Sequence, residues 1–166
     1  MLPLLLSKSV LQRIVGSALA RVKRHVFMPE HEVSDAATRD ESSDGPTEFT
    51  TIDGFVFHVL GNTEEMSVEV FPGPCPKFGE TFVERDVSSN GFWLRRLGKQ
   101  ICSLDALQSL YGAANSASAF ALEMAFLGAE PVVIEYLSDD EHIDQIRLTG
   151  SYSGPPCKRV NLAEDI

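Results

Sequence analysis

The sequence predicts an α+β fold of two layers, in which one long helix covers one face of an antiparallel sheet of four to six strands. Three observations predict it. Short segments between residues 55 and 97 alternate apolar and polar side chains, which is the period of a strand. Residues 100–131 carry small and apolar side chains at helical spacing over a helical length. Short connections between the strands favour an antiparallel meander.

Composition divides the 166 residues into four regions. Residues 1–28 carry five basic side chains and no acidic one, and they predict a basic amphipathic helical extension. Residues 29–48 are rich in acid and poor in large apolar side chains, which predicts a disordered linker. Residues 49–150 form the predicted α+β domain, and residues 151–166 a loop-like C-terminal tail.

The N-terminal helix is predicted because apolar residues such as Leu11, Ile14 and Val22 recur at helical period. Four interpretations stay open. The helix docks on its own domain or precedes a true start at Met28, it is an organellar presequence, it lies on a membrane surface, or it is a secretory signal. The secretory signal fits worst, since "LPLLL" is too short an apolar region. Nowhere does the chain have the run of about 18 apolar residues that a membrane span requires.

The domain opens with two strands, "GFVFHVL" at 54–60 and "MSVEV" at 66–70, joined by a turn. The segment "FPGPCPKFGE" at 71–80 predicts a loop, because it holds three prolines and two glycines. Two further strands, "TFVERDV" and "FWLRRL", are predicted to form a hairpin around Asn90-Gly91. After the long helix, "VVIEYL" and "IDQIRL" predict a last strand pair.

The predicted long helix has a second apolar face, which carries Phe120, Met124 and Leu127. A single sheet covers only one side of a helix, so something else has to cover this face. The candidates are the N-terminal helix, the C-terminal tail or a second copy of the chain. If the N-terminal helix is not the cover, the sequence predicts a homodimer through the long helix.

Residues 68–113 resemble a group of small bacterial α+β proteins of unknown function. In that group a strand, a Gly/Pro loop and a strand hairpin precede a helix that opens with D-x-x-Q-[AS]-L. Here Asp105, Gln108, Ser109 and Leu110 match that opening. The resemblance implies the same order of elements and a bacterial, cytosolic protein, and it implies no activity.

No cofactor, metal or catalytic residue is predicted. Cys75, Cys102 and Cys157 are odd in number and lie far apart, which predicts reduced thiols. His58 has no neighbouring ligand at zinc-site spacing and is expected on the wetter face of its strand. The acidic turn "SDDEH" at 138–142 lacks the spacing of a calcium loop, and no glycine-rich phosphate motif occurs.

One cluster of basic and aromatic residues stands out in the domain, with Trp93, Arg95, Arg96 and Lys99. Two interpretations are open: an edge strand that charge protects from aggregation, and a contact patch for an acidic partner. Together with Phe120, Met124 and Leu127 these residues form the candidate interaction surface.

The formal net charge of −10 argues against nucleic-acid binding, because phosphate is repelled. The sequence therefore favours a cytoplasmic, non-enzymatic protein-interaction module with an unknown protein partner, for example an inhibitor or immunity-type protein. The alternative is a small-molecule-binding domain or an enzyme whose site the sequence does not reveal. A deep polar pocket would favour the alternative, and a flat exposed patch would favour the interaction module.

Overall fold

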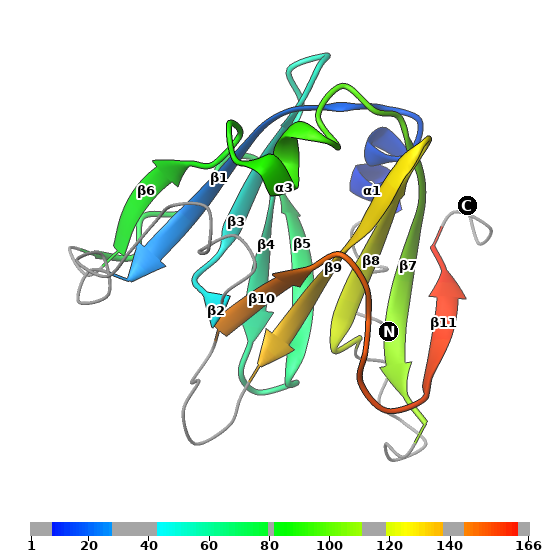
Figure 1. Ribbon diagram of the computed structural model, residues 1–166. Coiled ribbons are helices and arrows are strands. Elements are labelled where there is room, and N and C mark those ends of the chain that lie inside the picture. The colour runs from blue at the N-terminus through cyan, green and yellow to red at the C-terminus, as the bar shows by residue number, and fades with distance from the viewer. Residues whose placement is uncertain (1–7, 28–42, 80–81, 111–118, 138–144, 163–166) are drawn as a thin grey trace.

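The computed structural model describes residues 8–27, 43–79, 82–110, 119–137 and 145–162, which form a β-sandwich (Figure 1). The prediction of an α+β fold with a long helix is therefore wrong. Within these ranges the two helices have only seven and four residues. In chain order the elements are α1 (Lys8–Ile14), β1 (Leu19–Phe27), β2 (Ser43–Asp44), β3 (Thr47–Thr51), β4 (Val56–Asn62), β5 (Ser67–Pro72), β6 (Phe82–Asp86), α3 (Gly91–Leu94), β7 (Ile101–Ser109), β8 (Ala121–Phe126), β9 (Ala129–Leu137), β10 (Gln145–Thr149) and β11 (Cys157–Asn161).

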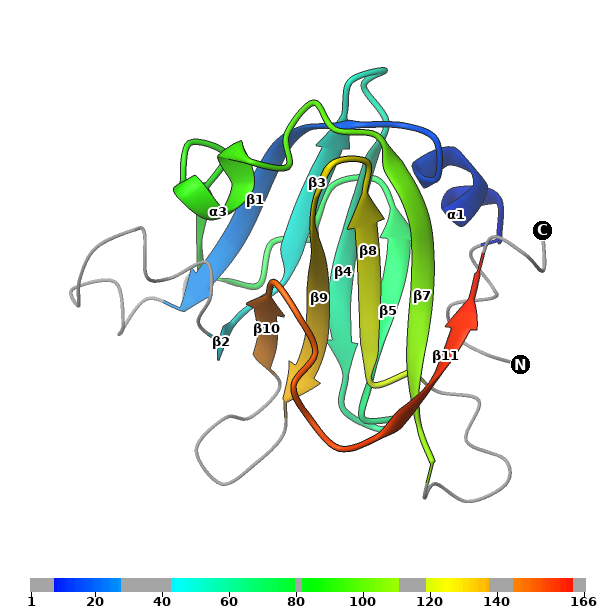
Figure 2. The same ribbon diagram turned by 45° about the vertical axis from the view of Figure 1, so that its right-hand side comes forward.

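Two sheets pack face to face, and every strand pairing is antiparallel. The first sheet has five strands in the order β5-β4-β3-β1-β6, and the second has six in the order β11-β7-β8-β9-β10-β2. Figure 2 shows β3, β4 and β5 behind β9, β8 and β7. One core lies between the sheets, and helix α1 contributes to it. Its fully buried members include Ile14, Val22, Phe49, Phe57, Val59, Val68, Ile101, Leu104, Leu122, Met124, Val132, Ile134 and Leu148.

The N-terminal region is only partly helical, so the prediction of one amphipathic helix there is wrong. The helix ends before Gly16, whose φ of 90° lies in the left-handed region that glycine tolerates. Strand β1 then runs between β3 and the edge strand β6 of the first sheet. The apolar side chains of α1 are buried in the core, so they form no stripe for a membrane surface.

A β-bulge explains why β1 resembles a helix in the sequence. Leu19, Val22 and Val26 are spaced by three and four residues, which is helical spacing, and all three are buried. The pairing register of β1 with β3 shifts between Leu19 and Arg21. One extra residue in a strand lets Leu19 and Val22 face the same side. From Val22 onward the alternation is regular, but Arg24 occupies the core-facing position between Val22 and Val26.

Residues 100–131 form strands where the sequence predicted the long helix. They contain β7, β8 and the start of β9, and residues 111–118 lie outside the described part of the chain. In β8 the side chains of Leu122, Met124 and Phe126 alternate on the buried side. Alanine, leucine and methionine favour helices in isolation, and here cross-strand packing overrides that preference. Gly128, with φ 73°, closes the turn between β8 and β9.

The hairpin predicted around Asn90-Gly91 is also wrong. Strand β6 forms, but the chain then continues as the short helix α3. Phe92 and Trp93 turn inward from α3, and the Trp93 ring packs edge-on against Phe49 at 5.7 Å between ring centroids. By contrast β4 and β5 form where alternation predicted strands, and β9 and β10 form where "VVIEYL" and "IDQIRL" predicted a strand pair.

Two predicted irregular regions contribute strands. Residues 43–48 of the predicted linker belong mainly to β2 and β3, and residues 29–42 lie outside the described part. The C-terminal tail contains β11, which pairs with β7 from Cys157 to Asn161. The acidic turn at 138–142 is likewise outside the described part.

Candidate functional site

The structure separates the seven residues of the predicted interaction surface. Trp93, Arg96 and Met124 are buried in the protein. Phe120 is half-buried against Tyr152, with ring centroids 5.5 Å apart, so the segment before β11 covers this side. Arg95, Lys99 and Leu127 are exposed.

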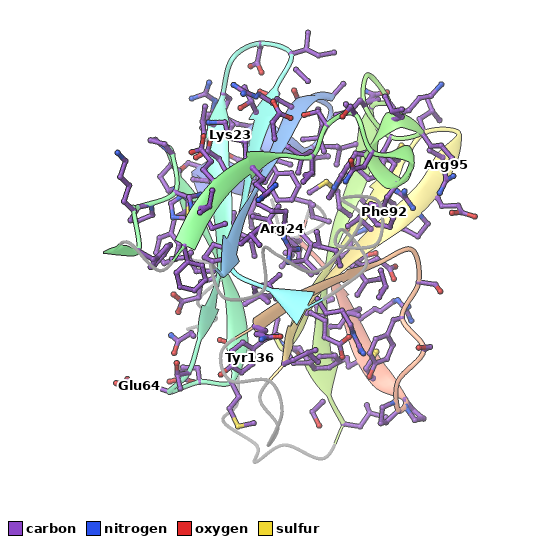
Figure 3. All side chains as sticks on the ribbon, turned by 60° about the vertical axis from the view of Figure 1, so that its left-hand side comes forward. Lys23, Arg24, Glu64, Phe92, Arg95 and Tyr136 are labelled. Carbon is purple, nitrogen blue, oxygen red and sulfur yellow. The ribbon has the colours of Figure 1, made fainter. Side chains whose placement is uncertain are left out.

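Arg96 holds α3 against the start of β9. Its guanidinium donates hydrogen bonds to the carbonyls of Phe92, Glu130 and Pro131, and it lies 4.1 Å above the Phe92 ring. Such a fork of donors suits arginine and no other side chain. Arg96 is therefore a structural residue, whereas its neighbour Arg95 points away from the protein (Figure 3).

The three exposed residues lie at one end of the sandwich, where a ladder of backbone contacts joins the two sheets. The Ile52 N–H donates to the Ala18 carbonyl, Ala18 bridges to Gln100, and the Leu127 N–H donates to the Gln100 carbonyl. The path from Ile52 through Ala18 and Gln100 to Leu127 thus has three backbone steps. At the usual spacing between neighbouring strands, Ile52 and Leu127 lie about 14 Å apart. The side chains of Ile52 and Leu127 are 65% and 63% exposed. We name Ile52, Arg95, Lys99 and Leu127 the loop end.

Ile52 was not identified from the sequence, because there it is only a residue that precedes a predicted strand. The signal available was a large aliphatic side chain beside Asp53-Gly54, a typical turn pair. Near the loop end, Arg95 and Glu130 line an open hollow together with Arg96, Gly128 and Ala129. Both charged side chains therefore border the same depression beside Leu127.

A second group of polar side chains lies on the outer face of the five-stranded sheet. Strand pairing places Lys23 opposite Glu48, Glu48 opposite His58, and His25 opposite Glu84. We name these five residues the polar cluster. Figure 3 shows Lys23 on this outer side, whereas Arg24 points between the sheets, where it donates to the Ile146 carbonyl at 3.0 Å.

The segment 73–79 covers much of the polar cluster. The Cys75 N–H donates to Oε2 of Glu48 at 2.8 Å, and His58 Nδ1 donates to the Gly73 carbonyl at 2.9 Å. The Phe78 ring packs edge-on against His25. Consequently His25, Glu48 and His58 are all buried although they face away from the core. The sequence predicted a loop at 71–80, and residues 73–79 form one, whereas Phe71 and Pro72 still belong to β5 (Ser67–Pro72) and residue 80 lies outside the described part of the chain. The sequence did not predict that this loop folds over the sheet.

Charges within the cluster are closely paired. Lys23 Nζ lies 2.9 Å from Glu84 and 3.4 Å from Glu48. The hydrogen bond to Glu84 raises the pKa of Lys23 and lowers the pKa of Glu84. Burial lowers the pKa of His25, although Glu84 and Glu48 oppose this effect. At neutral pH Glu84 is therefore ionised, Lys23 is an ammonium ion and the His25 imidazole is neutral.

Cys75 lies next to histidine and glutamate, yet its environment suppresses thiol chemistry. Burial, with a further contribution from Glu48 and Glu84, raises the pKa of the Cys75 thiol to about 12. Because the thiolate is the nucleophile, a thiol with this pKa is inert near neutral pH. The polar cluster is therefore not a cysteine nucleophile with its base.

The lowered pKa of His25 predicts a specific loss of stability in mild acid. From pH 7.5 to 5.5, the free energy of unfolding is expected to fall more in the wild type than in His25→Gln. Below the usual histidine pKa of 6.5 the unfolded chain binds a proton that the folded site resists, because the folded-state pKa is lower. The contribution of His25 to the free energy of unfolding is therefore complete above the usual histidine pKa of 6.5, and it is lost as the pH falls toward the lower pKa of the folded state.

Urea unfolding of both proteins at pH 7.5, 6.5 and 5.5 measures this difference. The pKa of Glu84 is lowered from its usual 4.5, so this carboxyl titrates below the window. The remaining histidines are present in both proteins and cancel in the comparison. Parallel curves for the two proteins would contradict the assignment to His25.

We compared the chain with protein-family models, with curated proteins and with solved structures, and none of the three comparisons finds a match. The resemblance to small bacterial α+β proteins therefore stays an untested prediction. Among the residues described, neither helix is long and apolar enough to cross a bilayer.

Proposed function

We propose that this chain is a non-enzymatic protein-interaction module, of the inhibitor or immunity-protein kind, and that the loop end is its contact surface. The observation that carries the proposal is the exposure of two aliphatic side chains, Ile52 and Leu127, at one end of the sandwich. Loops at the ends of a rigid sandwich commonly carry binding residues.

The loop end has the composition and rigidity of a contact surface. Arg95 and Lys99 add positive charge beside the aliphatic side chains, in a chain whose net charge is −10. Backbone hydrogen bonds from Ile52 and Leu127 fix the two turns that carry the aliphatic side chains. A surface that is already ordered loses less entropy on association. The partner surface proposed is apolar at its centre and acidic at its rim.

A homodimer through a long helix is no longer part of the proposal. Its central residue, Met124, is fully buried between the sheets. Phe120 lies against Tyr152 of the same chain. The three residues therefore do not form one face: the opposite sheet covers Met124, Tyr152 covers Phe120, and Leu127 is exposed.

The test compares partner capture by a variant in which both aliphatic residues of the loop end are replaced with capture by a matched control variant. Ile52→Glu/Leu127→Glu is expected to lose at least about tenfold of partner recovery in cross-linked capture from native lysate, since buried charge opposes association. The control is Met66→Glu, because Met66 is 59% exposed and lies in the turn between β4 and β5, at the opposite end of β4 from Ile52.

A separate thermal melt of each of the three proteins should be cooperative, so that a loss of partner binding can be distinguished from a loss of folding. The proposal requires a partner that the wild type and Met66→Glu retain and the loop-end variant loses. Equal recovery with all three proteins, or no specific partner with any of them, would overturn it.

A further inference from the structure

Three side chains of the polar cluster are placed as metal ligands. One ring nitrogen of His25 and one carboxylate oxygen each of Glu48 and Glu84 all lie within 4.8 Å of one another. They come from β1, β3 and β6, which are adjacent strands of one sheet. Backbone pairing therefore fixes the positions from which the three side chains project.

A second observation concerns the imidazole itself. His25 is only 4% exposed, and its Nε2 is buried with no hydrogen-bond partner among the described residues. An unsatisfied buried polar atom costs about 1–3 kcal/mol and calls for an explanation. A metal ion coordinated by Nε2 would provide the missing interaction.

We propose that His25, Glu48 and Glu84 bind a divalent first-row transition-metal ion, with zinc as the probe of choice. One imidazole nitrogen and two carboxylate oxygens form a donor set that suits Zn²⁺, Mn²⁺ or Fe²⁺. The site goes beyond the proposed interaction function and does not depend on it, since it lies on the outer face of the sheet rather than at the loop end.

The present arrangement already surrounds a cation, the Lys23 ammonium. Nζ of Lys23 lies close to both carboxylates, at 2.9 Å and 3.4 Å. A divalent ion would take the place of this ammonium and add His25 as a third ligand. Ligands of a metal with bonds of about 2.1 Å lie about 3 to 3.5 Å apart, so the group has to contract slightly. The Glu84 side chain is 52% exposed and has the freedom to move inward.

A metal site of this kind binds only through deprotonated ligands, which means ionised carboxylates and a neutral imidazole, so the titrations are run above neutral pH. Three protein ligands leave at least one coordination position for water, which can enter beside Glu84.

The first experiment titrates the metal-free full chain with Zn²⁺ by calorimetry at pH 7.5. The wild type is expected to bind one ion per chain at low micromolar concentration. His25→Gln and Glu84→Gln are each expected to bind at least about 10- to 100-fold more weakly, because even the loss of a group that only orients a metal ligand has an effect of this size. Glu84→Gln keeps the proposal testable if His25→Gln fails to fold, because Glu84 is half-exposed.

Cys102→Ser is the matched control, because the exposed Cys102 thiol is a rival zinc ligand. Its zinc affinity should equal that of the wild type. The proposal is overturned if the wild type binds no zinc. It is also overturned if His25→Gln and Glu84→Gln bind as tightly as the wild type.

Lys23→Met distinguishes a metal site from a purely structural ion network. Removing the competing ammonium is expected to tighten zinc binding by about fivefold or more, because two carboxylates are then left without their cation. Unchanged or weaker zinc binding by Lys23→Met would contradict the proposed exchange of ammonium for metal.

Discussion

A chain that begins at Met28 is expected to show no cooperative unfolding transition. It lacks α1 and β1, and β1 is the strand that joins β3 to β6 in the five-stranded sheet. Without it, β6 loses its only partner in that sheet among the described strands, and β3 acquires a long unpaired edge.

The apolar contribution of the missing segment is also large. It includes Ile14, Leu19 and Val22, which are all fully buried. Burying a side chain of this size contributes about 1.5–3 kcal/mol, and several such losses match the total stability of about 5–15 kcal/mol that a domain has. Thermal and urea denaturation followed by circular dichroism measure the outcome. A cooperative melt near that of the full chain would show that β1 is dispensable.

Two single substitutions in β1 of the full-length chain test whether burial of this strand, rather than the length of the chain, is needed for folding. Val22→Asp places a carboxylate in the core and is expected to destabilise the protein by more than about 4 kcal/mol. Arg21→Thr is the neighbouring control. Its side chain is 51% exposed and pairs with Asp86, and an exposed pair of this kind contributes about 0–1 kcal/mol.

Among the strands that the sequence predicted correctly, β4 has the clearest alternation of buried and outward-facing residues. Its Phe57 and Val59 enter the core while His58 faces outward, and no register shift interrupts the pairing with β3 or β5. In β1 and β7 a bulge precedes the regular alternation, between Leu19 and Arg21 and between Ile101 and Ser103. A bulge changes the spacing of buried residues from two to three, which is the spacing of a helix.

Residue type added to the error in β8. Its sequence "ALEMAF" contains good helix formers and no β-branched residue, so local preference and spacing agreed on a helix. What decides the strand is pairing with β7 and β9, and each pairing joins residues that local patterns do not connect. Non-local pairing of this kind is not visible in a single sequence.

The candidate sites were harder to predict than the strands. His25 and Glu48 were assigned to an extension and a linker, and only strand pairing brings them together with Glu84. The loop end is a similar case, since Ile52 and Leu127 are 75 residues apart in the sequence and lie at the same end of the sandwich through the backbone ladder at Ala18 and Gln100. Arg95, Lys99 and Leu127 were among the predicted surface residues, although Arg95 was assigned to a hairpin strand and Leu127 to a face of the long helix, neither of which forms.

Met124→Glu is expected to prevent stable folding. The Met124 side chain is fully buried in the common core, and its strand lies between β7 and β9 in the middle of the six-stranded sheet. The described core around it is formed largely by apolar side chains, so a carboxylate would be buried without a compensating partner. Either the carboxyl is protonated at a cost or the sheets separate, and the expected loss exceeds about 4 kcal/mol.

Leu127→Glu is the control three residues away. Leu127 is 63% exposed in the turn before β9, and its backbone N–H, which a substitution leaves in place, makes the contact with Gln100. A surface change of this kind is expected to alter the free energy of unfolding by no more than about 0.5 kcal/mol. Urea denaturation compares the two variants directly. A folded, monomeric Met124→Glu protein would mean that this residue lies on a surface, and the two-sheet packing would then be incorrect at its centre. Loss of folding in both variants would instead give the turn a structural role and remove Leu127 from the proposed contact surface.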